Sequence, residues 1–145
     1  MSTLGLKRYD PMIHSEIKKE QLKAFVKEAI AFSKIYGKKA ALQEFMNKDG
    51  LFQRGELYIF AYDYKAIVLS HGANPNWVGN DFSKLKDPTG MLILKEMIKI
   101  VKAKDNGWIR YKWFHPMTKK ITRKLGYVEK VDSTWWLGSG IYYDD

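Results

Sequence analysis

Residues 55–142 consist of short runs rich in Tyr and Trp, separated by loops of Asn, Pro and Gly. Aromatic and β-branched residues favour strands, in which neighbouring side chains point to opposite faces. Single charges stand beside the aromatic rings, so polar groups are placed on an otherwise apolar surface. This pattern is typical of a small sheet that wraps a small polar ligand.

The first third of the chain is predicted to form two helices. Residues 15–36 repeat apolar side chains at helical spacing, with Ser15 as the expected N-cap and Gly37 as the C-terminal stop. The apolar face contains Leu22, Phe25, Val26, Ala29 and Ile30. A shorter helix is predicted over about 38–48, and both helices are expected to cover one face of the sheet.

The chain then switches to a strand pattern. Residues 57–64 and 66–70 are predicted to form a hairpin. Both faces of the first strand are apolar, so we expect it to lie inside the sheet. One face contains Tyr58, Phe60 and Tyr62, and the other contains Leu57, Ile59 and Ala61.

A helical crossing and three more strands complete the predicted fold. The third helix should begin at Asp87 and Pro88 and bury the face that contains Met91, Leu94, Ile98 and Val101. Strands are predicted at 108–114, about 123–132 and 135–142. The 145 residues are therefore expected to form one domain over 1–145. Its fold class is α+β, a five-stranded antiparallel sheet with a long N-terminal helix and a helical crossing between strands two and three.

Several classes of function receive no support from the sequence. Cysteine is absent, so disulfides and thiolate metal sites are excluded. Nucleophile, phosphate-loop, dinucleotide and zinc-protease motifs are missing, and His14, His71 and His115 are isolated. We therefore expect no metal, no cofactor and no catalysis. A small hydrolase or isomerase that uses His71 with a distant acid remains an alternative.

The net charge of +9 allows a second alternative, a protein that binds nucleic acid or an anionic surface. The basic residues are spread over both ends of the chain and mixed with acids, so a solvated surface is favoured and nucleic acid is not a preferred partner. No apolar run approaches the length of a membrane span, and none is expected in this sequence.

Residues of three predicted strands and one loop are candidates for a small-molecule pocket on grounds of pattern alone. Tyr111 and Trp113 share one face of a predicted strand, Tyr58 and Tyr62 share a face of another, and His71 begins a loop expected to lie across the sheet. Lys130 lies inside a predicted strand, where an ammonium close to phenol and indole donors would suit a carboxylate. Plainer interpretations stay open: the rings pack, the histidine caps its loop, and the lysine is solvated.

Seven segments occur in a fixed order with compatible spacings. They are FAYD (60–63), HGANP (71–75), DFSKLKDPTG (81–90), GWIRYKW (107–113), PMTKK (116–120), KLGYVEKVD (124–132) and WWLGSGIY (135–142). In this order they resemble the single Cache domain, type 2, a PAS-like ligand-sensing family of chemoreceptors and sensor histidine kinases. The resemblance implies a PAS-like sheet behind a long helix, with a pocket between the sheet and the 71–106 crossing. The implied ligand-binding residues are Tyr62, His71, Tyr111, Trp113 and Lys130.

The resemblance also implies a function. It is that of a non-catalytic sensor domain for signal transduction or chemotaxis, whose ligand is a small organic acid. The N-terminal helix would carry the signal to a signalling partner or to a second subunit, which makes a homodimer through this helix a candidate assembly. Typical members are extracytoplasmic and flanked by membrane spans. The expected location is therefore cytoplasmic for a stand-alone protein and extracytoplasmic for part of a receptor, and Met1 slightly favours the first.

Overall fold

A five-stranded antiparallel sheet forms the centre of the protein in the computed structural model, which describes residues 11–143. The strands follow the order β4 (Val68–His71), β3 (Phe60–Asp63), β7 (Trp135–Tyr143), β6 (Ile121–Lys130) and β5 (Asn106–Phe114). A separate ribbon of β1 (Gln53–Arg54) and β2 (Leu57–Tyr58) precedes β3. The predicted α+β fold class is confirmed, as is the inner position of β3, which lies between β4 and β7.

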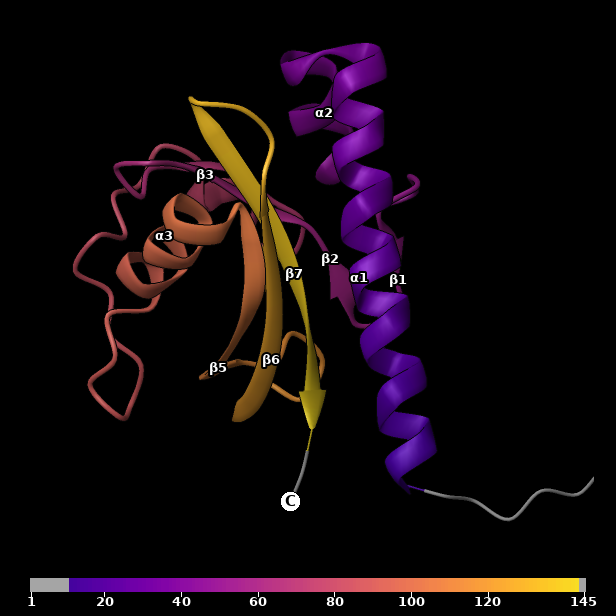
Figure 1. Ribbon diagram of the computed structural model, residues 1–145, viewed down its shortest axis with the longest axis vertical. Helices are drawn as coiled ribbons and strands as arrows, with labels where there is room; N and C mark the ends of the chain where they lie inside the picture. Colours follow the sequence, from indigo (N-terminus) through magenta and orange to yellow (C-terminus); the bar gives the residue numbers. More distant parts are fainter. Residues whose placement is uncertain (1–10, 144–145) are drawn as a thin grey trace, which may run out of the picture.

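Two helices cover one face of this sheet, as predicted (Figure 1). The long helix α1 (Pro11–Tyr36) begins ahead of Ser15, so the expected N-cap is wrong, while α2 (Lys38–Phe45) ends earlier than expected. The predicted apolar face of α1 is entirely buried in one core, which also contains Leu125, Tyr127, Trp135, Leu137 and Ile141 from the sheet. Apolar spacing therefore located the face that packs better than it located the ends of the helices.

The third helix, α3 (Ile93–Lys104), covers the opposite face (Figure 1). The prediction that this helix begins at Asp87 is wrong, because Asp87 caps a separate turn. One carboxylate oxygen accepts the backbone N–H of Thr89 at 2.9 Å and that of Met91 at 3.1 Å. The other accepts the backbone N–H of Lys112 in β5 at 3.1 Å. Asp87 thus ties the crossing to the sheet, and the short helix η1 (Pro75–Trp77) lies earlier in the same crossing.

The two faces of the sheet carry different side chains because alternate residues point in opposite directions. In β6 and β7 the odd-numbered residues contribute to the core under α1, whereas Val128 and Trp136 contribute to the core under α3. The same division in the chain before the crossing places Tyr58, Phe60 and Tyr62 under α3. This confirms the predicted face.

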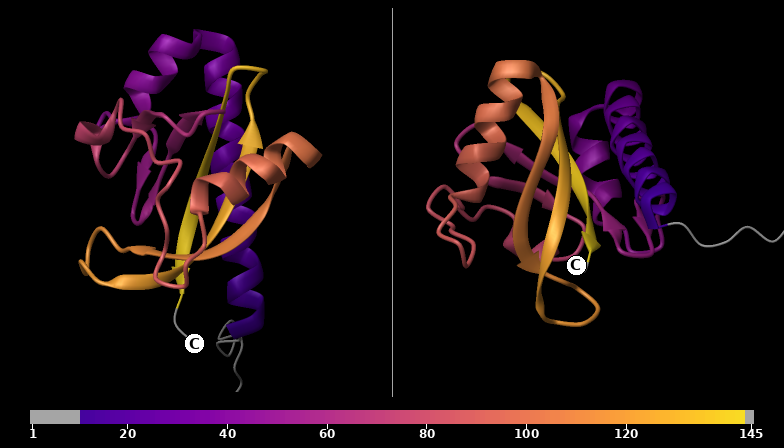
Figure 2. Two further views of the ribbon diagram at one scale, coloured as in Figure 1. Left: turned by 90° about the vertical axis from the view of Figure 1, so that its left-hand side faces the viewer. Right: turned by 60° about the horizontal axis from the view of Figure 1, so that its bottom comes forward.

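The β5–β6 hairpin is the longest paired segment of the sheet, with its turn between Phe114 and Ile121. Figure 2 shows this turn extending away from the other strands, at the end of the molecule where β7 finishes. The first turn of α1 lies toward the same end (Figure 1). Among the described residues, no helix is both long enough and apolar enough to cross a membrane.

Candidate functional site

A pocket lies between α3 and the sheet. Its walls come from β3, the second half of β5, the first half of β6, the end of β4 and the first turns of α3. The lining residues are Phe60, Tyr62, His71, Ile93, Leu94, Met97, Tyr111, Trp113 and Lys124. The free volume inside it is about 10 Å³, which is room for about one water molecule. The pocket therefore suits small molecules, and a ligand of several atoms requires its walls to move.

Lys124 is the one cation that lines this pocket. Its side chain is 1% exposed, and its ammonium donates a hydrogen bond to the Tyr58 hydroxyl at 2.8 Å. The rings of Tyr58, Phe60, Tyr111 and Tyr142 surround it, with the ammonium 4.6, 5.3, 5.8 and 5.0 Å from their centroids. Among residues 11–143, no carboxylate forms an ion pair with it. A buried ammonium without a counterion favours an anion at its two remaining donors.

Glycines in β7 explain how the sequence accommodates a lysine inside the protein. A Cβ at Gly140 would lie 2.5 Å from Cε of Lys124, and a Cβ at Gly138 would lie 2.8 Å from the Phe60 ring. Both glycines lie on the face under α3, because Trp136 and Tyr142 flank them at the same alternation. The absence of side chains at these positions leaves the space that the lysine occupies.

His71 is held as a neutral donor. Burial, followed by the nearby charge of Lys124, lowers the pKa of His71 to about 3. Its Nδ1 accepts the backbone N–H groups of Ala73 at 3.2 Å and Asn74 at 3.0 Å, so the ring proton resides on Nε2. A histidine with Nδ1 occupied and such a low pKa is a poor general base at neutral pH, but its Nε2–H is a donor.

The phenols and the indole of the pocket are donors as well. Burial raises the pKa of Tyr62 and of Tyr111 far above the ordinary value, so both stay protonated at neutral pH. Neither hydroxyl, nor the Trp113 indole N–H, hydrogen-bonds to another of the residues that the structure describes. The polar groups that line the pocket are therefore one cation and several neutral donors.

Four of the five predicted ligand-binding residues, Tyr62, His71, Tyr111 and Trp113, meet in this pocket. Lys130 does not line it. It is exposed at the end of β6, where its backbone N–H donates to the Asp105 carbonyl at 2.7 Å. The lysine that the prediction lacked is Lys124, which shares the strand and the alternation of Lys130.

Cross-strand register is the signal that distinguishes the two lysines. Lys124 lies directly between Tyr111 of β5 and Tyr142 of β7, whereas Lys130 pairs with Trp136 at the strand's end. In the sequence Lys124 directly follows Arg123, close to Lys119 and Lys120, and so resembles part of a solvated basic turn.

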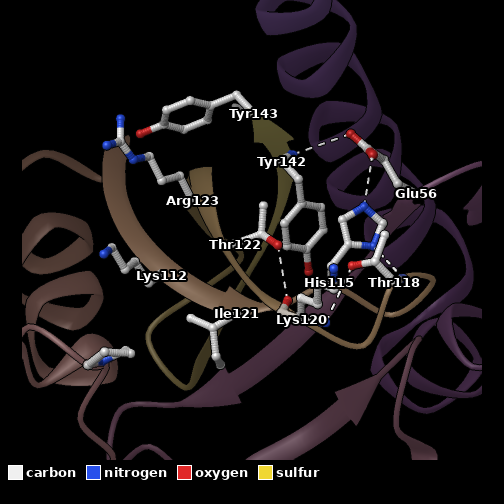
Figure 3. A pocket seen from close by; sticks show the side chains of 11 residues that line it. Glu56, Lys112, His115, Thr118, Lys120, Ile121, Thr122, Arg123, Tyr142 and Tyr143 are labelled. Carbon is white, nitrogen blue, oxygen red and sulfur yellow. Dashed lines mark hydrogen bonds and ion pairs between the residues drawn. The ribbon is translucent and has the colours of Figure 1, made fainter. Parts of the chain in front are cut away.

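A larger and more open concavity, of about 820 Å³, lies at the base of the β5–β6 turn (Figure 3). His115 and Glu56 face each other there, with 3.5 Å between Nε2 and the carboxylate. His115 Nδ1 accepts the backbone N–H groups of Met117 and Thr118 at 3.1 and 3.4 Å, so both ring nitrogens are engaged. This arrangement leaves no free base. No cluster of metal-ligating side chains occurs within the described part of the chain.

Three hydroxyl contacts join the two concavities. Tyr142 donates to the Phe114 carbonyl at 3.2 Å, and its oxygen lies 3.3 Å from the Tyr58 hydroxyl, which accepts from Lys124. Because the carbonyl only accepts and the ammonium only donates, each phenol donates toward Phe114. The position of the buried lysine is thus linked to the end of β5.

Comparison with known proteins gives a consistent family. The model of the family described as single Cache domain 2 matches residues 9–145. The methyl-accepting chemotaxis protein McpP of Pseudomonas putida is 30% identical over 61% of this chain, and the sensor histidine kinase MctS of Rhizobium johnstonii is 36% identical over 61%. The matches cover 16% and 19% of those proteins, so the chain spans less than a fifth of the length of these relatives.

Solved structures agree over nearly the whole chain. A methyl-accepting chemotaxis protein from Vibrio parahaemolyticus superposes with a TM-score of 0.80 at 26% identity, covering 92% of this chain and 94% of that one. A Cache chemosensory domain whose structure describes carboxylic acid recognition gives 0.77 at 28% identity, covering 94% and 100%. A periplasmic sensor domain of a chemotaxis protein gives 0.72 at 25% identity, covering 93% and 100%.

Proposed function

Because this chain belongs to the single Cache family of ligand-sensing domains, we propose that its pocket binds a small monocarboxylate through Lys124. The observation that carries the proposal is the polarity of the pocket. Its one buried cation lacks an acidic partner among the described residues, and the other polar groups of its lining are neutral donors. The carboxylic acid recognition of a similar Cache domain supports the same ligand class.

The ligand carboxylate would accept from the Lys124 ammonium and from the donors of His71, Tyr62 and Tyr111. Such a charge-assisted hydrogen bond in a water-excluded pocket is stronger than a neutral one. A single lysine matches a single negative charge, so a dicarboxylate would bury one carboxylate without a cation. The apolar residues of α3 that line the pocket would contact a short alkyl group, and the narrow space sets a limit of a few carbons.

Ligand sensing without catalysis is the simplest account of these side chains. Both histidines near a concavity have Nδ1 engaged by backbone N–H groups, which leaves His71 without support as a base. Nucleic acid is not a suitable ligand for this pocket, since the candidate ligand groups are buried.

The signal must cross the sheet to reach α1, because α1 and the pocket lie on opposite faces. β6 and β7 contact α1 on one side and carry Lys124 and Gly140 on the other. We therefore infer that opening the pocket changes the packing of α1, which passes the signal to a partner or to a second copy in a homodimer. As in the periplasmic sensor domain to which it is similar, the chain would work outside the cytoplasm as part of a receptor.

Calorimetric titration with acetate, propionate, butyrate and succinate tests the ligand class, with acetamide and propionamide as uncharged controls of matched shape. We expect one or more of the short monocarboxylates to bind and the amides and succinate to fail. At a hundred times its dissociation constant the ligand should stabilise the protein by about 2.7 kcal/mol. Equal binding of propionate and propionamide would contradict the role of the ammonium. Amide exchange in α1 with and without ligand tests the signal path, and sedimentation tests the dimer.

A further inference from the structure

The β5–β6 hairpin is basic on a scale that the rest of the chain does not approach. Between Asp105 and Glu129 the sequence contains no acidic residue, whereas it contains six basic ones. Lys124 is buried in the pocket, but Lys112, Lys119 and Lys120 are exposed. Among residues 11–143, no carboxylate forms an ion pair with these three lysines. The turn of the hairpin is therefore a local concentration of positive charge.

The same turn carries three exposed apolar side chains. Phe114 is 46% exposed, Ile121 is 54% exposed and Met117 is 73% exposed. Phe114 and Ile121 are direct cross-strand partners, and Lys112 and Arg123 form the next pair on the same face. Moving from the turn toward the sheet, one face of the hairpin thus presents an apolar pair and then a cationic pair. Figure 3 shows Lys112, Lys120 and Ile121 around the open concavity at this level.

Backbone hydrogen bonds hold the turn in this arrangement. The backbone N–H of His115 donates to the Lys120 carbonyl at 2.9 Å, and that of Lys119 donates to the His115 carbonyl at 2.9 Å. His115 Nδ1 also accepts from the backbone of Met117. The apolar side chains are consequently presented to solvent by an already ordered loop, and binding through them requires little further ordering.

We propose that this turn, with the strand ends that flank it (residues 112–123), binds the surface of a bilayer that contains anionic phospholipid. The order of its groups matches the layers of a membrane: Phe114, Met117 and Ile121 would enter the interfacial region, and Lys112, one cross-strand pair behind them, would lie at the depth of the lipid phosphates. Lys119 and Lys120 lie within the turn itself, and their long side chains would extend back to the phosphates. A soluble acidic partner would satisfy the lysines alone. The turn lies at the end of the molecule where β7 finishes and toward which α1 begins, so both ends of the described chain face the same surface (Figures 1 and 2).

Co-sedimentation of the whole chain with vesicles tests the proposal. We expect the protein to pellet with vesicles of phosphatidylglycerol and phosphatidylcholine, and to remain in solution with phosphatidylcholine alone. Binding should weaken as salt rises, because screening shortens the reach of the lysines. Lys119→Glu with Lys120→Glu should lower the partition coefficient by about twentyfold or more. Phe114→Ser, Met117→Ser and Ile121→Ser together should lower it by about tenfold or more.

Matched variants at the α2 end of the molecule serve as controls. Lys39→Glu with Lys48→Glu makes the same change of charge on exposed lysines, and Ile35→Ser with Leu51→Ser removes exposed apolar side chains. Both controls should bind vesicles nearly as well as the unchanged chain, and unchanged thermal unfolding shows that each variant is folded. A protein that stays in solution with anionic vesicles overturns the proposal. So does an equal loss of binding in the charge control, which would indicate attraction by net charge alone.

Discussion

Replacing Lys124 with Met should separate ligand binding from stability. Methionine has nearly the length of lysine and no charge, so it can occupy the same space beneath Gly140. The side chain it replaces is 1% exposed, makes one hydrogen bond, to Tyr58, and has no acidic partner in the described part of the chain. The charge is therefore dispensable for the unliganded fold, but the proposed ligand depends on it.

The magnitudes follow from these contacts. Burying an ammonium costs several kcal/mol. The hydrogen bond to Tyr58 offsets about 1.5–3 kcal/mol of this cost, and cation–π interactions with the surrounding rings offset about 2 kcal/mol. These contributions nearly cancel, so we expect the free energy of unfolding of Lys124→Met to lie within about 2 kcal/mol of the unchanged protein. A carboxylate buried without its cation loses about 3–5 kcal/mol, which is a loss of affinity of about a hundredfold to several thousandfold.

Urea unfolding gives the first quantity, and calorimetric titration with the best monocarboxylate gives the second. Lys130→Met is the matched control, because it removes an exposed lysine from the same strand and should leave affinity unchanged. Two results would refute the reasoning: full affinity in Lys124→Met, or loss of affinity in Lys130→Met alone. The second would restore Lys130 as the ligand-binding lysine.

Three further predictions concern His71, Gly140 and Asp87. The pKa of His71 is about 3 in the folded protein and about 6.5 in the unfolded chain, so neutral His71 contributes fully to the free energy of unfolding above pH 6.5. This contribution falls by about 1.4 kcal/mol per pH unit from pH 6.5 toward pH 3. Urea unfolding at several pH values should therefore show a weaker dependence of the free energy of unfolding on pH in His71→Asn. Gly140→Ala places a methyl group 2.5 Å from Cε of Lys124 and should weaken acid binding in titration by about tenfold or more, whereas a methyl group tolerated with full affinity would contradict this geometry. Asp87→Ala removes the tie between the crossing and Lys112 and should lower the free energy of unfolding by about 2–4 kcal/mol, measured in urea; a change below about 1 kcal/mol would mean that the turn holds without it.

Local periodicity was sufficient to predict the elements that pack. The apolar face of α1 and the two faces of the strand around Tyr58 could be identified because each repeats within a few residues. The start of α3 could not, because Asp87 followed by Pro88 is equally suited to cap a helix and to cap a turn. Asp87 caps a turn here because it also accepts the backbone N–H of Lys112, and a partner so distant in sequence cannot be predicted from the local pattern.

The residues of the candidate site were likewise predicted only in part. Resemblance to a family placed Tyr62, His71, Tyr111 and Trp113 in one pocket, and the structure brings these four together. The prediction named Lys130, because this lysine lies inside a predicted strand, and it did not consider Lys124, which lies on the same face of β6. Only the pairing of three strands shows which lysine lies among aromatic rings and which lies at the end of a strand.

The alternation of β6 and β7 has a consequence for engineering. The even-numbered side chains of these strands lie on the face toward α3, where Lys124 lines the pocket, and the odd-numbered ones lie on the face toward α1. A change at Lys124 or Gly140 would therefore alter the proposed ligand site without substituting a residue of the core beneath α1. A library of variants confined to the even-numbered positions of β6 and β7 could be screened for new ligands, while the core beneath α1 keeps its amino-acid composition.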